Sequence, residues 1–182
     1  MFPLVLDLTD RRVLVIGAGE VGARKASQLI AAGARVNVIA KEVLATLPDD
    51  VESVQQRAYE LGDLDTAFLV VVATGDDQVN DQIIEEARGC NLLVNVVDDP
   101  RRSNFFFTAV HRDGDVTVSV STGGASPALA QWVRDRAAWA LPRNLAAVAY
   151  QLREERATLH AKYESTEFRD WTARVEQLVN EL

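Results

Sequence analysis

Three glycines, at positions 17, 19 and 22, have the spacing of a site that binds phosphates. They form Gly-x-Gly-x-x-Gly directly after the apolar run Val13–Ile16 and directly before a stretch with helical character. In such a corner the first glycine permits a tight turn, the second lets a pyrophosphate approach the backbone, and the third lets helix and strand pack closely. Free amide groups and the helix dipole then face the phosphates. The spacing therefore predicts a dinucleotide site at Gly17, Gly19 and Gly22.

A carboxylate, Asp98, ends a second chemically informative run, Asn95–Asp98. Residues 92–97 are almost continuously apolar, which is typical of a buried parallel strand. Ligands bind beyond the carboxyl ends of such strands, so we expect Asp98 beside the nicotinamide of a bound dinucleotide. There a carboxylate can accept a proton while the nicotinamide accepts a hydride. Alternatively, Asp98 or Asp99 could cap the turn before Pro100. The residue types alone do not decide between a catalytic and a capping role.

Positioning these residues requires an α/β fold with a Rossmann-type parallel sheet. Helices are expected at about 19–32 and around 79–87, where Gly33 and Gly89 end them. Thr74 follows a buried strand at its carboxyl end and is therefore a candidate cofactor contact. The pattern predicts a weak edge segment at 4–8 and strands at 13–16, 35–40, 51–59, 68–73 and 92–97, of which 51–59 lies near an edge.

The end of the second strand leaves the choice of coenzyme open. In NAD-binding folds an acidic residue often ends this strand and holds the ribose hydroxyls. Here the strand ends in Ile39, Ala40, Lys41 and Glu42, with no acid at the usual place. Glu42 would serve as a late acid, whereas Lys41 would favour the 2′-phosphate of NADP.

Beyond residue 104 the pattern changes to a β-hairpin. Two β-rich runs, 105–112 and 116–121, flank Asp113–Asp115, a sequence typical of a hairpin turn. We therefore expect an NAD-binding Rossmann domain at residues 1–112. A second region, at 113–182, begins at the turn of this hairpin.

The second region reads as helical after the hairpin. Ser126 and Pro127 have the types expected at the N-cap and first position of a helix, and the pattern breaks at Leu141–Pro142. Trp132 and Trp139 share one helix face, which favours packing in the core or in a dimer. Apolar residues in the tail predict one more helical layer: Leu152, Leu159, Tyr163, Trp171, Val175 and Leu178. Acidic residues in the same part of the chain predict a solvated helix face: Glu154, Glu155, Glu164 and Glu167.

Composition and charge exclude several classes of protein. With 182 residues, 48% of them hydrophobic, and a net charge of −8, we expect one or two acidic globular domains that do not bind nucleic acid.

The single cysteine, Cys90, cannot form an intrachain disulfide and is expected as a small buried residue in a reducing compartment. No leader pattern or membrane-spanning apolar run is present, so we expect a cytoplasmic protein. Because His111 and His160 are the only histidines, no tightly held metal is expected.

Four stretches of the chain together resemble one enzyme family. They are Gly17–Gly22 with Arg24-Lys25, Ala73-Thr74 with Asp76-Asp77 and Val79-Asn80, Asn95–Asp98, and Ser121–Pro127. In this order they are similar to precorrin-2 dehydrogenase/sirohydrochlorin ferrochelatase, the N-terminal module of sirohaem synthase. The resemblance implies NAD-dependent oxidation of precorrin-2 to sirohydrochlorin. In bifunctional members Fe2+ then enters as a substrate to give sirohaem. The resemblance also implies a homodimer, built by the segment after the nucleotide domain. Residues 113–182 are thus expected to form a dimerisation and helical substrate or chelatase region.

The same resemblance assigns roles to individual residues. It makes Asp98 the key catalytic group, because this residue closes the Asn-Val-Val-Asp motif. It places nucleotide contacts on the glycine turn and at the end of the second strand, here Glu20, Val21, Lys41 and Glu42. One carboxylate could serve both reactions, since iron insertion also requires protons to leave the pyrrole nitrogens.

A tetrapyrrole substrate carries many carboxylates, for which guanidinium groups are suitable partners. Candidate partners, each with a solvated surface charge as the alternative, are Arg101, Arg102, Arg112, Arg134 and Arg136. Asn104 and the run Phe105–Phe107 could line a slot for the macrocycle, although three adjacent phenylalanines also suit a core or an interface. Asn95, Ser121 and Thr122 are the remaining candidate substrate contacts. Thr122 stands where some family members carry a phosphorylated serine, so that form of regulation is not carried over.

Two other functions are compatible with the same glycine corner. An NAD(H)-sensing regulatory domain would bind the dinucleotide without catalysis and would need neither Asp98 nor an arginine-lined slot. A dehydrogenase acting on another small anion would keep the cofactor site and change the substrate contacts. Titration with sirohydrochlorin separates the sensor from the enzyme, because a sensor should not bind it.

Overall fold

The computed structural model describes residues 1–162, 165 and 169–181. It consists of two compact units, Met1–Phe106 and Phe107–Leu182. Tyr163, Glu164 and Glu167, for which the sequence predicted roles in the helical tail, lie outside the described residues.

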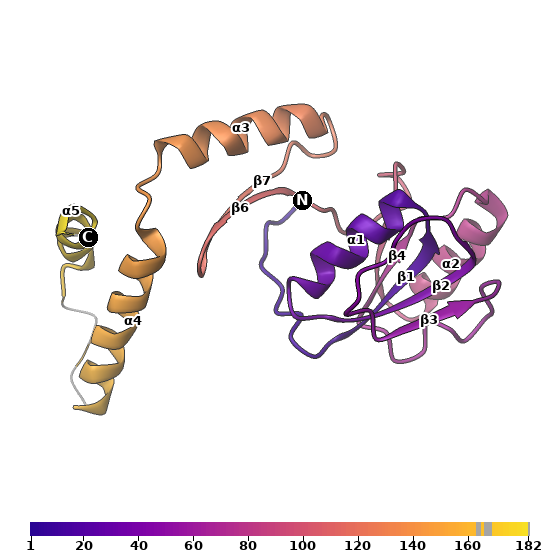
Figure 1. Ribbon diagram of the computed structural model, residues 1–182, viewed down its shortest axis with the longest axis horizontal. Coiled ribbons are helices and arrows are strands. Elements are labelled where there is room, and N and C mark those ends of the chain that lie inside the picture. Colours follow the sequence, from indigo (N-terminus) through magenta and orange to yellow (C-terminus); the bar gives the residue numbers. More distant parts are fainter. Residues whose placement is uncertain (163–164, 166–168, 182) are drawn as a thin grey trace. The chain divides into compact units, whose positions relative to one another are not determined.

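The first unit is a five-stranded parallel sheet with helices packed against it (Figure 1). The strands lie in the order β3-β2-β1-β4-β5, and every neighbouring pair is parallel. The order reverses beside β1, which is where doubly wound sheets bind ligands. The predicted Rossmann-type α/β fold is therefore confirmed. In chain order the elements are β1 (Arg12–Ala18), α1 (Glu20–Ile30), β2 (Arg35–Val43), β3 (Ser53–Gln56), β4 (Leu69–Val72), α2 (Asp77–Gly89) and β5 (Leu93–Val96).

The core of this unit lies on both faces of β1 and β4, whose residues alternate between the two faces. Leu14 and Val70 belong to a buried cluster that also contains Ile83 and Ile84 of α2. The alternate residues of both strands point to the other face, and α1 packs against β1 and β2. Because both faces are covered, all four residues of β4 are buried, as the continuous apolar run predicted.

β2 differs from the prediction at its carboxyl end, because it runs to Val43 rather than ending near Ala40. A register shift in β1 just before Ala18 lets Ala18 pair with Val43. The strand therefore continues past its last buried residues. Lys41 and Glu42 consequently lie within β2 and not beyond it.

Two predictions for short segments are wrong. Residues 4–8 form no strand, and only Leu8 among them is buried; β3 and β5 form the two edges of the sheet instead. Cys90 is exposed rather than buried. The reason is that α2 ends at Gly89, which places Cys90 at the C-cap position on the surface.

Within its described residues, the second unit joins an antiparallel hairpin to three helices. β6 (Ala109–Asp113) and β7 (Val116–Val120) are connected by a tight turn at Gly114, whose φ is +55°. α3 (Pro127–Ala140) packs against both strands, and α4 (Leu145–Ala161) packs against α5 (Trp171–Glu181). The predicted hairpin and the helix break at Leu141–Pro142 are confirmed.

The helices of the second unit bury only part of their apolar surface. Leu159 of α4 and Leu178 of α5 are buried, which confirms the additional helical layer. Trp132 and Trp139 of α3 are 58% and 84% exposed, so the prediction that they pack in the core is wrong. α3 buries the small side chain of Ala130 instead, which leaves both indole rings at the surface. A role for them in a dimer stays a prediction.

Ser126 caps α3, as its type and position predict. Its Oγ accepts a hydrogen bond from the amide of Leu129 at 3.2 Å. Ser126→Ala is expected to lower the unfolding free energy of the second unit by about 1 kcal/mol, because an amide in the first turn loses its partner. Urea unfolding followed by circular dichroism measures the change. Ser126→Asp keeps an acceptor and should retain most of the stability, whereas an unchanged stability of Ser126→Ala contradicts the cap.

Candidate functional site

The three glycines of the corner are required for different reasons. Gly17 has a φ of +108°, and a Cβ there would overlap the carbonyl oxygen of Ala73. A Cβ at Gly22 would overlap the carbonyl oxygen of Gly17, so this glycine lets α1 lie close to β1. Gly19 has an ordinary φ of −82°, and a Cβ there would meet nothing within 4 Å. Internal packing thus does not require glycine at position 19, and the open space beside it fits the approach of a pyrophosphate.

The start of α1 leaves its amide groups available to a ligand. Gly19 is the N-cap residue and has no side chain to accept hydrogen bonds from the first turn. α2 and α3, by contrast, are capped by Asp76 and Ser126. Uncapped amides and the helix dipole attract anions. Glu20 is exposed and Val21 half-buried in this turn, and neither lines the cavity described next, so only their backbone amides suit the predicted cofactor contacts.

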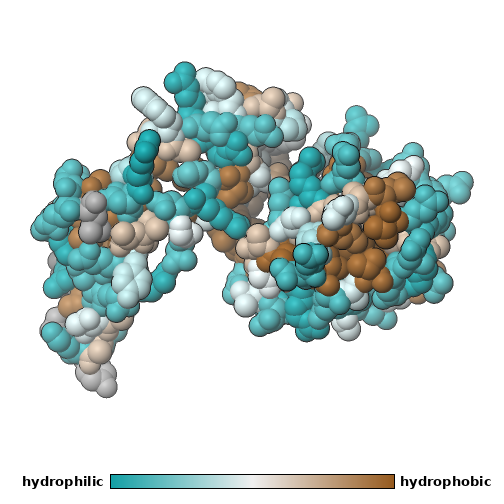
Figure 2. All heavy atoms as spheres, in the orientation of Figure 1, coloured by the Kyte–Doolittle hydropathy of each residue, from teal (hydrophilic) through white to brown (hydrophobic). Residues whose placement is uncertain are grey.

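A cavity of about 350 Å³ lies at the carboxyl ends of β1, β2 and β4. β2 and β4 flank β1, so the cavity is at the point where the strand order reverses. Figure 2 shows apolar residues gathered on the visible face of this unit, and Leu44, which lines the cavity, is 75% exposed. The structure brings together five of the eight predicted cofactor contacts in this lining: Gly17, Gly19, Lys41, Glu42 and Thr74.

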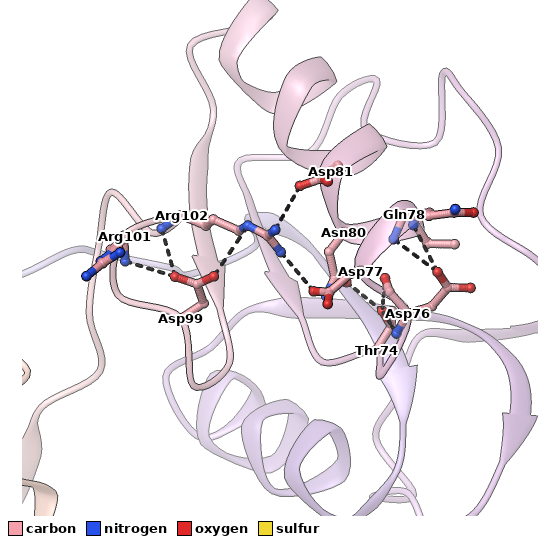
Figure 3. Close-up of polar contacts among 10 residues, drawn as sticks. Thr74, Asp76, Asp77, Gln78, Asn80, Asp81, Asp99, Arg101 and Arg102 are labelled. Carbon is pink, nitrogen blue, oxygen red and sulfur yellow. Dashed lines mark hydrogen bonds and ion pairs between the residues drawn. The ribbon is translucent and has the colours of Figure 1, made fainter.

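Thr74 and Asp76 form the rim of the cavity after β4 (Figure 3). Thr74 Oγ1 donates to Oδ1 of Asn80 at 2.5 Å and accepts from the amide of Asp76 at 3.2 Å. Asp76 Oδ1 accepts from two amides in the first turn of α2. From the end of β2, Lys41 Nζ lies 3.6 Å from Oδ2 of Asp76. The rim is therefore fixed by α2, and the charge of Lys41 is balanced by Asp76.

Two residues that the sequence did not single out, Arg57 and Tyr59, also line the cavity. Arg57 makes a two-pronged ion pair with Asp63, at 2.8 and 2.6 Å. Tyr59 donates its hydroxyl proton to Glu86, and burial together with this carboxylate raises the pKa of Tyr59. The predicted strand at 51–59 is confirmed as an edge strand, but β3 ends at Gln56. Arg57 and Tyr59 therefore follow the strand at its carboxyl end instead of lying within it.

Asp98 follows β5, as predicted, in an uncommon backbone conformation. The amide of Val97 donates to the carbonyl oxygen of Val72 at 2.9 Å, which extends the pairing of β5 with β4 to the residue before Asp98. Asp98 then adopts a φ of +60°, in the left-handed region that aspartate tolerates better than most residues. It is exposed and does not line the cavity. The carboxylate therefore stands on the loop of the strand next to the cavity rim.

Lys25 of α1 is a charged residue near Asp98 that sequence analysis did not assign to the site. A Cβ at Gly22, one helical turn earlier, would lie 3.6 Å from the Cβ of Ala73, so this part of α1 packs at the end of β4. Burial, assisted by repulsion from Arg24, lowers the pKa of Lys25 to about 8, whereas Asp98 acts to raise it. The Arg24-Lys25 pair carried the family resemblance, but a sequence pattern does not show this burial.

We expect Lys25 to react with an amine reagent at a lower pH than an ordinary lysine. With a pKa of about 8, roughly half of the Lys25 amines are uncharged at pH 8, against about one in 300 for an ordinary lysine. Acetylation over a pH series, followed by peptide mapping, should give a midpoint near 8. Asp98→Asn should move the midpoint lower still, because Asp98 stabilises the charged amine. An ordinary lysine midpoint, unaffected by Asp98→Asn, contradicts this arrangement.

Asn95 and Asn104, predicted to contact the substrate, hold the loop after β5. Asn104 pairs with the edge of that strand, since its Oδ1 accepts from the amide of Val94 at 2.7 Å and its Nδ2 donates to the carbonyl of Leu92 at 2.9 Å. Asn95 is buried and donates from Nδ2 to the carbonyl of Phe105 at 3.0 Å. Both amide groups thus bind backbone within the first unit.

Arg101, Ser121 and Thr122 are the other predicted substrate contacts. Arg101 is exposed on the loop after β5. Ser121 and Thr122 belong to the second unit, where their hydroxyl oxygens accept from the amides of Gly123 and Ser126, each at 3.2 Å. These bonds shape the turn before α3. Contact of the three residues with a substrate stays a prediction.

In the part of the chain that the structure describes, no three His, Cys, Asp or Glu side chains come together as metal ligands. His111 lies on β6 and His160 in the last turn of α4. None of the described helices combines the length and the apolar character needed to cross a membrane.

Comparisons with known proteins match both units. A family model described as "Putative NAD(P)-binding" matches residues 4–109, and one described as "Sirohaem biosynthesis protein central" matches residues 113–136. A siroheme synthase of Mannheimia succiniciproducens is 38% identical over 152 residues, which cover 81% of this chain and 32% of that protein. Siroheme synthase 2 of Aeromonas hydrophila is 39% identical over 153 residues, with the same coverage. The chain thus spans about a third of the length of these relatives.

A solved structure shows the same fold. SirC, precorrin-2 dehydrogenase, matches 100% of this chain and 88% of its own with a TM-score of 0.70 and 25% sequence identity. Together the matches confirm the resemblance that the four sequence stretches indicated. The chain therefore belongs to the NAD(P)-binding family whose model covers residues 4–109.

Proposed function

We propose that this chain is a precorrin-2 dehydrogenase, which oxidises precorrin-2 to sirohydrochlorin with NAD in the biosynthesis of sirohaem. One observation carries this proposal. The open cavity beside Gly19 and the loop that bears Asp98 both lie at the carboxyl ends of the parallel strands. The similarity to SirC and to siroheme synthases supports the substrate class, a flat tetrapyrrole with many carboxylates.

The residues of the cavity suit NAD better than NADP. Glu42 offers a carboxylate at the end of β2, where an acidic side chain can bind ribose hydroxyls. Lys41, which would attract a 2′-phosphate, is already 3.6 Å from the carboxylate of Asp76. The glycine corner and the uncapped amides of α1 would hold the pyrophosphate. Thr74 lies at the rim, where its hydroxyl is fixed by Asn80 and the amide of Asp76.

The chemistry divides between the cofactor and one carboxylate. When bound, NAD supplies the acceptor for a hydride from the substrate. The substrate must lose a proton as well, and the proposal assigns this step to Asp98, whose loop follows β5 beside β4. Because Asp98 is exposed on its loop, a large macrocycle can reach it without a change in the core of the sheet.

Substrate binding and dimer formation are assigned to the loop after β5 and to the second unit. The exposed guanidinium of Arg101 can bind a substrate carboxylate in its forked geometry. Ser121 and Thr122 present hydroxyl groups in the turn before α3, where that of Thr122 is held by the backbone of Ser126. The exposed Trp132 and Trp139 supply apolar surface for a second copy of the chain in a homodimer.

Insertion of iron is proposed as a second reaction, in which Fe2+ is a substrate and sirohaem the product. The pyrrole N–H protons must leave as the metal enters, and Asp98 can accept protons in this step as in the first. A reducing compartment, the cytoplasm, suits both Fe2+ and the exposed thiol of Cys90.

A two-stage incubation tests the proposal. Precorrin-2 is supplied with NAD, or with NADP in a parallel sample, and formation of sirohydrochlorin is followed by absorbance before Fe2+ is added. We expect oxidation to be faster with NAD and the spectrum to change to that of sirohaem after the metal is added. Binding of NAD without oxidation would instead identify an NAD(H) sensor. Oxidation without iron insertion would restrict the activity to the dehydrogenase.

A further inference from the structure

Arg102 is surrounded by three carboxylates in the first unit (Figure 3). Its Nη1 lies 3.0 Å from Oδ1 of Asp77, its Nη2 lies 3.2 Å from Oδ1 of Asp81, and its Nε lies 3.3 Å from Oδ2 of Asp99. The Arg102 side chain is 30% exposed, whereas those of Asp77 and Asp81 are 86% and 65% exposed, so the network lies at the surface of the unit. All three sides of the guanidinium already have a carboxylate partner, which leaves Arg102 poorly placed to bind a substrate carboxylate.

The three partners of Arg102 belong to two different segments. Asp77 and Asp81 lie in the first turns of α2, the helix that begins directly after the cavity rim at 74–76. Asp99 lies on the loop after β5, next to Asp98. Arg102 is thus an ionic link between the rim of the cofactor cavity and the loop that carries the proposed catalytic carboxylate.

Local hydrogen bonds give the Asp98 loop a defined shape. Asp99 Oδ1 accepts from the amides two and three residues further on, at 3.0 and 3.2 Å. Ser103 Oγ accepts from the amide of Val96 and donates to the carbonyl oxygen of Asp99, both at 2.9 Å. These bonds fold the loop onto β5, and the ion pairs of Arg102 then tie the folded loop to α2. Asp98, with its φ of +60°, lies between these fixed points.

We propose that Arg102 is a positioning residue for the dehydrogenase reaction, which fixes Asp98 relative to the cofactor cavity by tying the loop after β5 to the first turns of α2. The inference rests on the proposed function, in which Asp98 accepts a proton. A planar guanidinium directs separate N–H groups to the three carboxylates, and a lysine ammonium does not reproduce this fork. A displacement of about 1 Å in a reacting group can slow a reaction roughly 100-fold, so the link affects the rate without touching the substrate.

The test compares two variants of Arg102 with a matched control. Arg102→Met removes the link, Arg102→Lys keeps the charge if the first variant fails to fold, and Arg88→Met changes an exposed arginine at the other end of α2. We expect Arg102→Met to lower kcat for precorrin-2 oxidation by roughly 10- to 100-fold, and Arg102→Lys to lie between. The KM for precorrin-2 and the Kd for NAD should stay within about twofold. Arg88→Met should behave as the unaltered chain.

A double variant shows whether the effect passes through Asp98. In an Asp98→Asn background, Arg102→Met should cause no further loss of kcat, because the group that it positions is already gone. An additional loss equal to that of the single variant overturns the proposal. A raised KM at unchanged kcat in Arg102→Met also overturns it, since Arg102 would then bind the substrate directly.

Hydrogen exchange separates this inference from the proposed function. If the unaltered chain oxidises no precorrin-2, the proposed function is wrong. Hydrogen exchange then still shows whether Arg102 ties the loop after β5 to α2. The amides of residues 97–104 should exchange faster in Arg102→Met, while those of β1 and β4 keep their protection. Equal exchange of residues 97–104 in the two proteins shows that Arg102 does not hold the loop.

Discussion

Exchanging Asp98 for asparagine is expected to slow NADH formation from precorrin-2 by about 100- to 10,000-fold, the usual range for loss of a general base. Asparagine keeps the size of the side chain and tolerates a left-handed backbone, so the φ of +60° can persist. NAD should bind as before, because Asp98 does not line the cavity. Steady-state kinetics with precorrin-2 and titration with NAD measure the two effects separately.

The backbone at Asp98 decides which variant is informative. Alanine in a left-handed conformation costs roughly 1–2 kcal/mol, so Asp98→Ala would combine loss of the carboxylate with a displaced loop. Asp50→Asn, on the exposed loop between β2 and β3, is the matched control and should keep full activity. NADH formation by Asp98→Asn at the rate of the unaltered chain would remove this residue from the mechanism.

Gly19→Val is expected to abolish NAD binding while leaving the fold intact. A Cβ at this position meets no protein atom within 4 Å and the φ is −82°, so the Cβ of valine is accommodated without backbone strain. Its methyl groups would occupy the space through which a pyrophosphate reaches the amides of α1. We expect the Kd for NAD to rise at least about 100-fold, equivalent to roughly 2.7 kcal/mol. The melting temperature should fall only by the small cost of a β-branched residue at the N-cap of α1.

Two further glycine variants make this result specific. Gly17→Val should destabilise the first unit, because the residue has a φ of +108° and its Cβ would overlap the carbonyl of Ala73. Gly89→Val, at the end of α2, also meets open space and should leave NAD binding unchanged. Unaltered NAD affinity in Gly19→Val would show that the dinucleotide does not approach this corner. Isothermal titration calorimetry and thermal unfolding provide the two measurements.

Features that depend on neighbouring residues in the sequence could be predicted. The glycine corner, the buried run of β4 and the cap at Ser126 each follow from local backbone geometry or apolar content. The turn at Gly114 is equally local, since it needs one residue with a positive φ between two β-rich runs. A general rule of the fold also placed Lys41, Glu42 and Thr74 at the cavity. The carboxyl ends of neighbouring parallel strands lie on the same side of the sheet, and these residues lie at or follow such ends.

Features that depend on distant residues could not be predicted. The extension of β2 to Val43 requires a register shift in a different strand, β1. Arg57 reaches the cavity because β3 ends at Gln56, whereas the sequence pattern predicts a strand that continues to residue 59. Arg102 finds Asp77 25 positions earlier in the chain, so its sequence neighbours suggested a surface or substrate-binding arginine instead. Residue type alone predicts Cys90 in the interior, but the end of α2 places it at the surface.

A crystal structure of the chain with bound NAD is the most direct test of the proposed cofactor and Asp98 geometry. We predict the pyrophosphate on the first amides of α1 beside Gly19, a ribose at Glu42, and the nicotinamide ring at the end of β4 on the side of the Asp98 loop. A nicotinamide directed away from β5, or a dinucleotide bound outside the cavity lined by Gly19 and Thr74, would contradict it.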